Sequence, residues 1–107
     1  MGEKIRIAIA SSDGKNVDLH FGDASHFLIF EVEGNKVNFV ELREKEKKPL
    51  QEHSDRWMQS LNMIKDCKAI LCSRMGQEPA FKLKEVGITP VQFTGTIPEA
   101  IKFYLSN

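Results

Sequence analysis

The sequence predicts an α/β fold, with a mixed five-stranded sheet and helices packed on it. The runs that predict strands are residues 5–10, 27–33, 36–42, 69–72 and 88–93. Gly34-Asn35 separates two of these runs and is a two-residue hairpin signal, so that pair should be antiparallel. Residues 69–72 are wholly apolar, which is typical of a central strand covered on both faces. A helical pattern between the last two runs predicts a right-handed crossover, which makes those strands parallel.

Three helices are predicted from their end signals and apolar stripes. The first begins with Ser54 as its cap, the second begins near Pro79 and stops at Gly87, and the third opens with a capping box from Thr96 to Glu99. The stripe residues are Trp57, Met58, Leu61 and Ile64 in the first helix, Ala80, Leu83 and Val86 in the second, and Ile97, Ala100, Ile101 and Tyr104 or Leu105 in the third. These elements predict the strand order 3-2-1-4-5 with the second strand antiparallel. Residues 43–53 are charged and should form an exposed, mobile loop.

Length and charge limit the classes of protein that this chain can represent. At 107 residues we expect a single domain over residues 1–107. Lys plus Arg and Asp plus Glu both number 15, so no field of one sign attracts nucleic acid or an anionic membrane, and we expect neither as a partner. The sequence has no secretory segment and no run of about 20 apolar residues, so we expect a cytoplasmic protein.

The two cysteines, Cys67 and Cys72, are not a disulfide framework. Along a strand they would stand about 16 Å apart, at about 3.3 Å per residue, and their odd spacing would send them to opposite faces of the sheet. They should therefore neither bridge nor share one metal. The thiolate set that usually binds an iron–sulfur cluster is absent from the sequence.

The segment Asp18-Leu19-His20-Phe21-Gly22 contains the main candidate for binding chemistry. Two apolar neighbours predict a semi-buried imidazole that points outward, and Gly22 would allow a sharp turn after it. Open α/β sheets bind ligands beyond the carboxyl ends of their parallel strands. That rule gathers three turns at one edge, namely residues 11–14 with His20, residues 72–76, and residues 94–96.

This edge should hold an imidazole, a thiol, a guanidinium, glycines that let a ligand approach, and two helix N-termini with unsatisfied N–H groups. Such a set favours an anion or a metal cluster with net negative charge. The candidate binding residues are Ser11, Ser12, His20, Phe21, Gly22, Cys72, Arg74, Gly76, Thr94 and Gly95.

Each candidate side chain could also have a purely structural role, with no part in ligand binding. On spacing alone, a His20 that hydrogen-bonds a neighbouring backbone group is slightly favoured over a ligand. Cys72 would then be a small buried hydrophobe, and Arg74 would extend from the sheet edge with its aliphatic part packed. His26 and His53 have less support as ligands, because one precedes a strand and the other lies in the charged loop.

Several blocks of the sequence resemble the dinitrogenase iron–molybdenum cofactor biosynthesis family, which includes NifX-like proteins and the carboxyl-terminal domain of NifB-type proteins. In the first half they are IAIAS at residues 7–11, VDLHFGDA at 17–24 and FLIFEV at 27–32. In the second half they are DCKAILCSRMG at residues 66–76, LKEVGITP at 83–90 and IPEAI at 97–101. The resemblance therefore covers nearly the whole chain.

The resemblance implies a ribonuclease H-like three-layer fold and a non-catalytic role in nitrogen fixation. That role is to bind the iron–molybdenum cofactor, or an iron–sulfur precursor, between a cluster donor and an acceptor protein. The histidine of the family motif is the leading metal ligand, which implies that role for His20. The chain lacks the radical-chemistry domain and the cysteine-rich tail of larger relatives, so we expect no synthesis step. We expect transient holding by a monomer or a weak homodimer.

Two other classes of function compete with a cluster carrier. The implied fold also hosts nucleases, which need several carboxylates around paired metal ions. The carboxylates near the edge are Asp13, Asp18 and Asp23, all in the first turn region, so a metal-dependent hydrolase is the least favoured function. A regulatory domain that binds a small anion or a protein partner at the same edge remains the main alternative.

Overall fold

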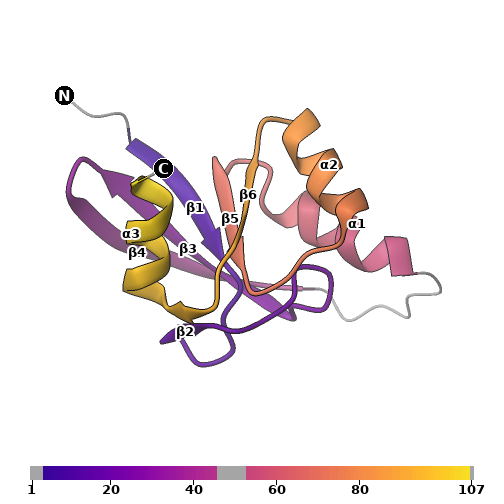
Figure 1. The fold of residues 1–107 in the computed structure, drawn as a ribbon, viewed down its shortest axis with the longest axis horizontal. Helices are drawn as coiled ribbons and strands as arrows, with labels where there is room; N and C mark the ends of the chain where they lie inside the picture. Colours follow the sequence, from indigo (N-terminus) through magenta and orange to yellow (C-terminus); the bar gives the residue numbers. More distant parts are fainter. Residues whose placement is uncertain (1–3, 46–52, 107) are drawn as a thin grey trace.

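The main sheet has five strands in the order β4-β3-β1-β5-β6 (Figure 1). The computed structural model describes residues 4–45 and 53–106, and the side chains of residues 53–55 are outside that description. The strands are β1 (Lys4–Ile9), β3 (His26–Glu33), β4 (Lys36–Glu44), β5 (Ala69–Cys72) and β6 (Thr89–Gln92). β5 pairs parallel with β1 and β6, whereas β3 pairs antiparallel with β1 and β4. The mixed α/β sheet agrees with the sequence, and the ribonuclease H-like assignment stays a prediction.

The hairpin between β3 and β4 forms at Gly34-Asn35, as predicted. Glu33 and Lys36 are cross-strand partners, and Gly34 has a φ of +60°, a conformation that glycine adopts without a steric penalty. β4 continues to Glu44, so the predicted loop was wrong at its start. Most of the rest, residues 46–52, lies outside the described residues.

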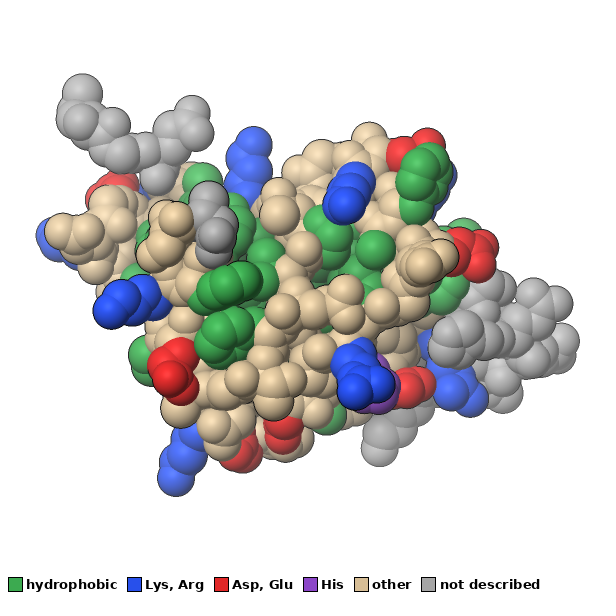
Figure 2. Space-filling model, in the orientation of Figure 1, with side chains coloured by type: hydrophobic (Ala, Val, Ile, Leu, Met, Phe, Trp, Pro, Cys, Tyr) green, Lys and Arg blue, Asp and Glu red, His purple; other side chains and the backbone are tan. Residues whose placement is uncertain are grey.

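Three helices cover the two faces of the sheet. They are α1 (His53–Met63), α2 (Gln77–Glu85) and α3 (Ile97–Leu105). α1 and α2 lie on one side and α3 on the other (Figure 1), and each side has its own cluster of buried residues. The rings of Phe93 and Phe103 have centroids 5.2 Å apart and are tilted by 35°. Hydrophobic side chains gather at the surface between α3 and β6 (Figure 2). Among the helices of residues 53–106, none has the length and apolar character needed to cross a bilayer.

The helix stripes are confirmed at most positions and wrong at a few. Met58 is 50% exposed because Trp57, Leu61 and Ile64 already fill the buried face of α1 and its turn. Val86 is 50% exposed, since it is the C-cap after the last turn of α2.

Of the predicted helix starts, that of α3 is confirmed and that of α1 is wrong. α1 begins at His53, so Ser54 is inside the helix instead of preceding it, and its side chain is not described. The capping box of α3 is confirmed, with the Thr96 hydroxyl accepting from the Glu99 amide. Tyr104 is half-buried and Leu105 is exposed at the end of this helix.

The structure adds two short strands that the sequence analysis missed. β2 (Asn16–Val17) pairs antiparallel with β7 (Gly95–Thr96) in a separate two-stranded sheet. Two residues are too few to give an alternating pattern, so no periodic signal marked these strands.

Both cysteines are buried free thiols in the same hydrophobic cluster, on the α1 and α2 side of the sheet. The prediction that Cys67 and Cys72 face opposite sides was therefore wrong. Cys67 lies in the turn after α1, where its amide donates to the Ile64 carbonyl, so strand alternation does not apply to it. Burial raises the pKa of each thiol to about 12, so both stay protonated at neutral pH.

An ionic cluster joins the sheet to the turn after α1. Asp66 accepts from Arg43 at 2.6 and 2.8 Å and from Arg6 at 3.1 Å, and Arg43 also donates to the Met63 carbonyl at 2.7 Å. The hydrogen bonds from Arg43, and then those from Arg6, hold the pKa of the Asp66 carboxyl well below its usual range. Arg43 is thus a strand residue that anchors the end of α1.

We expect Asp66→Asn to lower the free energy of unfolding at pH 7 by about 1 kcal/mol, because the pair is partly exposed. The pKa of Asp66 is depressed in the folded state. Its contribution is therefore present above the unfolded value of about 3.9 and is lost as the pH falls toward the folded value. Urea unfolding at pH 7 and pH 3 should show the difference between variant and wild type shrinking at pH 3. Glu33→Gln, at an exposed carboxylate, is the control, and an equal effect at both pH values would contradict the assignment.

Candidate functional site

A short parallel backbone bridge places His20 beside Arg74, beyond the carboxyl end of β5. The Phe21 amide donates to the Arg74 carbonyl at 3.0 Å, and the Ser73 amide donates to the Leu19 carbonyl at 3.0 Å. The chain that follows β1 thus runs alongside the chain that follows β5. Because successive residues alternate sides, Phe21 is fully buried while His20 points outward.

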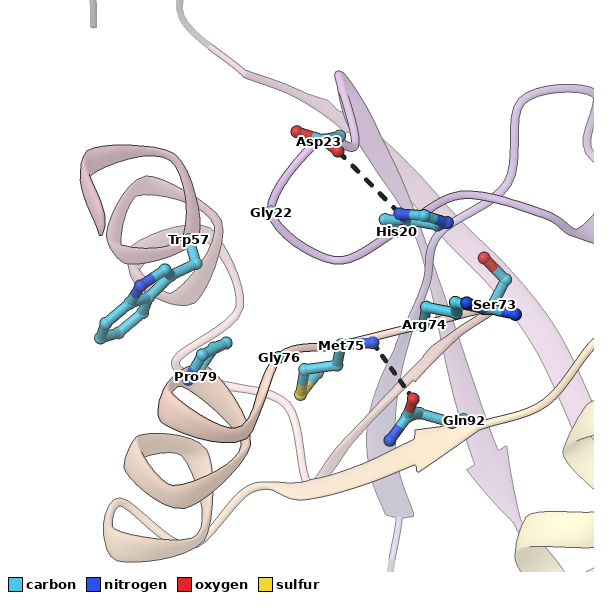
Figure 3. Close-up of a pocket in the computed structure, with 10 residues that line it drawn as sticks. All are labelled: His20, Gly22, Asp23, Trp57, Ser73, Arg74, Met75, Gly76, Pro79 and Gln92. Atoms are coloured by element: carbon cyan, nitrogen blue, oxygen red, sulfur yellow. Dashed lines mark hydrogen bonds and ion pairs between the residues drawn. The ribbon is translucent and has the colours of Figure 1, made fainter. Parts of the chain in front are cut away.

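A pocket of about 560 Å³ opens between this bridge and the two helices of the same side (Figure 3). Its volume lies within the range of ordinary ligand sites, about 300 to 1,000 Å³. The residues that line it are His20, Gly22, Asp23, Trp57, Ser73, Arg74, Met75, Gly76, Pro79 and Gln92.

The His20 side chain is 58% exposed, so the predicted semi-buried ring was wrong. Its Nδ1 lies 4.0 Å from an Asp23 carboxylate oxygen, and the other Asp23 oxygen accepts from Arg56 at 3.3 Å (Figure 3 shows the first of these pairs). The ring therefore has a charged neighbour on its Nδ1 side. At 4.0 Å the carboxylate is too far to accept a hydrogen bond from the ring, so Asp23 is a polar neighbour of the imidazole rather than a fixed partner.

Two side chains form hydrogen bonds with backbone carbonyls next to His20. The buried Ser60 hydroxyl of α1 donates to the Phe21 carbonyl at 2.9 Å. The Lys45 ammonium, just after β4, donates to the Gly22 carbonyl at 2.8 Å, and desolvation lowers its pKa. Neither residue stood out in the sequence, because a serine on an apolar helix face and a lysine beside a charged loop carry no specific signal.

The second wall of the pocket is the turn from Ser73 to Gly76. The Met75 amide donates to the Gln92 side-chain oxygen at 3.2 Å, which ties this turn to the end of β6. Gly76 is the N-cap of α2 and makes no side-chain cap hydrogen bond, so the first turn of α2 begins at the pocket without a capping group.

Four of the ten residues predicted to bind line this pocket, and they are His20, Gly22, Arg74 and Gly76. The chain turns at residues 21–23, as expected, but Gly22 lies outside the positive-φ region, so the turn does not require a glycine conformation. A Cβ there would stand 3.6 Å from the Trp57 Cβ, which is ordinary contact.

Ser11 and Ser12 use their polar groups within their own loop instead of facing the pocket. The Ser11 hydroxyl accepts from the Gly14 amide at 3.0 Å, and the Ser12 amide and hydroxyl both donate to Asp18. Asp13 accepts from the Asn16 and Lys15 amides, and these hydrogen bonds hold its carboxyl pKa well below the usual range. The loop satisfies its own donors, so it offers few of them to a ligand.

The turn at Thr94 and Gly95 joins the first loop instead of the pocket. Gly95 pairs with Val17, and the Ile97 amide donates to the Lys15 carbonyl at 2.9 Å. The capping box closes the N-terminus of α3, so only one of the two expected helix ends, that of α2, begins at the pocket. Gly95 has a φ of +155° and a Cβ there would meet the Phe93 ring at 2.9 Å, so the fold itself requires this glycine.

Phe21 and Cys72 are fully buried beneath the site. Cys72 is therefore buried as a small hydrophobic residue would be, and burial raises the pKa of its thiol to about 12.

Six residues of the pocket were not among the predicted binding residues, and these are Asp23, Trp57, Ser73, Met75, Pro79 and Gln92. Ser73 and Met75 nevertheless lie in the turn of residues 72–76 that was predicted at this edge. Trp57 was assigned to the core, where it is indeed buried, but it also lines the pocket. Asp23 had a signal, since it follows His20 by three residues, but it was considered only as a carboxylate for hydrolysis.

Two charged side chains, Arg74 and Asp23, line the pocket, and two further cations lie near it. These are Arg56 and Lys45, which contact the turn at Gly22 and Asp23. Basic, acidic and histidine side chains lie together at one place on the surface (Figure 2). Among the described side chains, those of residues 4–45 and 56–106, no three His, Cys, Asp or Glu groups converge as a metal-ion site requires. The arrangement suits a negatively charged ligand held by one imidazole and by cations.

A small α/β domain with a pocket at the carboxyl end of its parallel strands is the class of protein that these features define. The chain belongs to the family described as dinitrogenase iron-molybdenum cofactor, whose pattern matches residues 3–107.

Relatives and a solved structure agree with this family. The FeMo cofactor biosynthesis protein NifB of Frankia alni is 30% identical in a 104-residue alignment that covers 92% of this chain and 20% of NifB. Protein NifX of Sinorhizobium fredii is 32% identical over 109 residues, covering 95% of this chain and 66% of NifX. The crystal structure of PH0822 superposes with a TM-score of 0.72 at 34% identity, covering 95% of this chain and 89% of PH0822. The chain thus spans about a fifth of NifB and about two thirds of NifX.

We expect Ser60→Ala to lower the free energy of unfolding by about 1 to 3 kcal/mol, because the buried Phe21 carbonyl would lose its side-chain donor. Ser106→Ala is the matched control, since that hydroxyl donates to the Lys102 carbonyl at the surface and its loss should cost under about 0.5 kcal/mol. Denaturant unfolding measures both variants. Equal losses would mean that Ser60 does not support the His20 segment.

Proposed function

We propose that this protein is a non-enzymatic carrier that holds an iron–sulfur or iron–molybdenum cofactor, or a precursor of it, in the pocket beside His20. The cluster is cargo, received from a donor protein and passed to an acceptor. The observation that carries the proposal is the exposed His20 imidazole at a pocket edged by Arg74. Membership of the family and the names of NifB and NifX support the choice of cargo.

The residues present fit transient holding better than tight capture. One imidazole supplies a metal ligand, with Asp23 beside its Nδ1 atom. Arg74, together with the amides at the start of α2, favours the negative charge of a thiolate- or carboxylate-bearing cluster. The buried thiols of Cys67 and Cys72 remain protonated and do not compete for the metal.

Anaerobic titration of the purified protein with an iron–sulfur cluster and with extracted iron–molybdenum cofactor tests this function. We expect wild type to co-elute with the cluster in gel filtration, and His20→Ala to bind at least about 10-fold more weakly, because the metal ligand is lost. His26→Ala is the matched control, since His26 lies at the start of β3 and does not line the pocket. A folded wild type that binds no cluster would remove the carrier function and favour the regulatory domain that binds a small anion or a protein partner.

Arg74→Gln separates charge from metal ligation. We expect it to weaken cluster binding several-fold at low salt and to reduce the dependence of affinity on salt, because an exposed cation acts through a screened field. The same titration at low and high ionic strength measures this. The backbone bridge to Phe21 should remain, since it uses the Arg74 carbonyl. An unchanged salt dependence would show that Arg74 does not face the cargo.

A further inference from the structure

The two edges of the main sheet are not equally protected against pairing with another strand. β6 forms one edge with four residues, and Pro90 within it has no N–H group to donate. β4 forms the other edge with nine residues, all of them exposed except Arg43. A long edge strand presents a row of backbone donors and acceptors to a further strand.

Apolar side chains of β4 face the side of the sheet that carries α3. Val37, Phe39 and Leu42 stand opposite Val32, Phe30 and Leu28, which belong to or pack against the hydrophobic cluster under α3. Cross-strand partners share one face of a sheet. These three side chains are nevertheless 40%, 56% and 47% exposed, because α3 does not extend over them.

A groove continues this apolar surface toward α3. It has a volume of about 400 Å³ and lies between the hairpin and the helix. Its apolar lining includes Phe30, Val37, Ile97, Pro98, Ile101 and Leu105. The exposed face of β4 and this groove therefore form one surface.

A bulge in β4 changes which of its residues face α3, so that two antiparallel copies of the strand can place apolar side chains on the same face. Val40 has no partner on β3, because Phe39 pairs with Phe30 and Glu41 pairs with the preceding residue, Ile29. Before the bulge the odd-numbered residues face α3, and after it the even-numbered ones do. A two-fold axis between Phe39 and Val40 would therefore oppose residues of the same face.

We propose that β4 pairs antiparallel with β4 of a second copy of this chain, in the register that sets Val37 opposite Leu42. The apolar residues of both copies then form one stripe across the joined sheets, beside the groove at each end. On the other face, Asn38 stands opposite Glu41, where an amide can donate to a carboxylate. The interface is isologous, so the same patch serves both copies.

The charges of the chain permit this pairing. The formal net charge is zero, so two copies do not repel as whole molecules. The register also sets Lys36 opposite Arg43, but Arg43 is already paired with Asp66 and Glu41. No residue of β4 lines the pocket beside His20, so a dimer keeps two open pockets, and the inference does not depend on the proposed function.

Sedimentation equilibrium from micromolar to near-millimolar concentration tests the pairing. We expect wild type to dimerise, and Phe39→Lys to raise the dimer Kd at least about 10-fold, because two ammonium groups would meet near the two-fold axis. Phe81→Lys is the matched control, since Phe81 is 66% exposed on α2. A wild type that stays monomeric throughout, or a dimer equally weakened by both substitutions, would overturn the proposal.

Mixing two charged variants gives a second test that does not depend on loss of binding alone. Phe39→Lys and Phe39→Glu should each dimerise more weakly than wild type, yet an equimolar mixture should dimerise more tightly than either variant alone, because opposite charges then meet at the axis. Circular dichroism of each variant should match wild type. Self-association of the separate variants with no gain on mixing would place the interface elsewhere and contradict the β4 register.

Discussion

The site depends on the backbone bridge that joins the His20 segment to the Ser73 segment. Two amide–carbonyl hydrogen bonds fix Leu19 and Phe21 against Ser73 and Arg74, at the carboxyl end of β5. This extension obeys the alternation of a strand, so burying Phe21 forces His20 outward. The pocket therefore follows from core packing, since the same residue that completes the hydrophobic cluster sets the direction of its neighbour's imidazole.

Hydrogen bonds within the protein determine which donors at the sheet edge remain available to a ligand. Asp13 and Asp18 take up the donors of the first loop, and the Thr96–Glu99 capping box takes up those of α3. α2 has no such cap, and it begins beside the His20 pocket. The groups at this edge that remain available to a ligand are therefore the N-terminus of α2, the His20 imidazole and the cations around them.

Much of this arrangement was predictable from the sequence, because the signals are local or periodic. The Gly34-Asn35 hairpin, the apolar β5 and the Thr96 capping box each depend on a few adjacent residues. Asp23 and Gln92 were not predictable as pocket residues, because their positions depend on how separate turns pack. The prediction that Cys67 and Cys72 lie on opposite faces of the sheet was wrong for a related reason. Cys67 lies in the turn that ends α1, where side chains do not alternate as they do along a strand.

On the proposed function, the protonation of the thiols bears directly on release of the cargo. A cluster held by thiolates would leave slowly, whereas Cys67 and Cys72 are buried and their pKa values are raised to about 12. The remaining holding groups are His20 and exposed cations, whose attraction is weakened by solvent and salt. An acceptor that offers thiolates can then displace a single imidazole without first unfolding the carrier. The burial that stabilises the core thus also keeps its two strongest metal-binding groups away from the cargo.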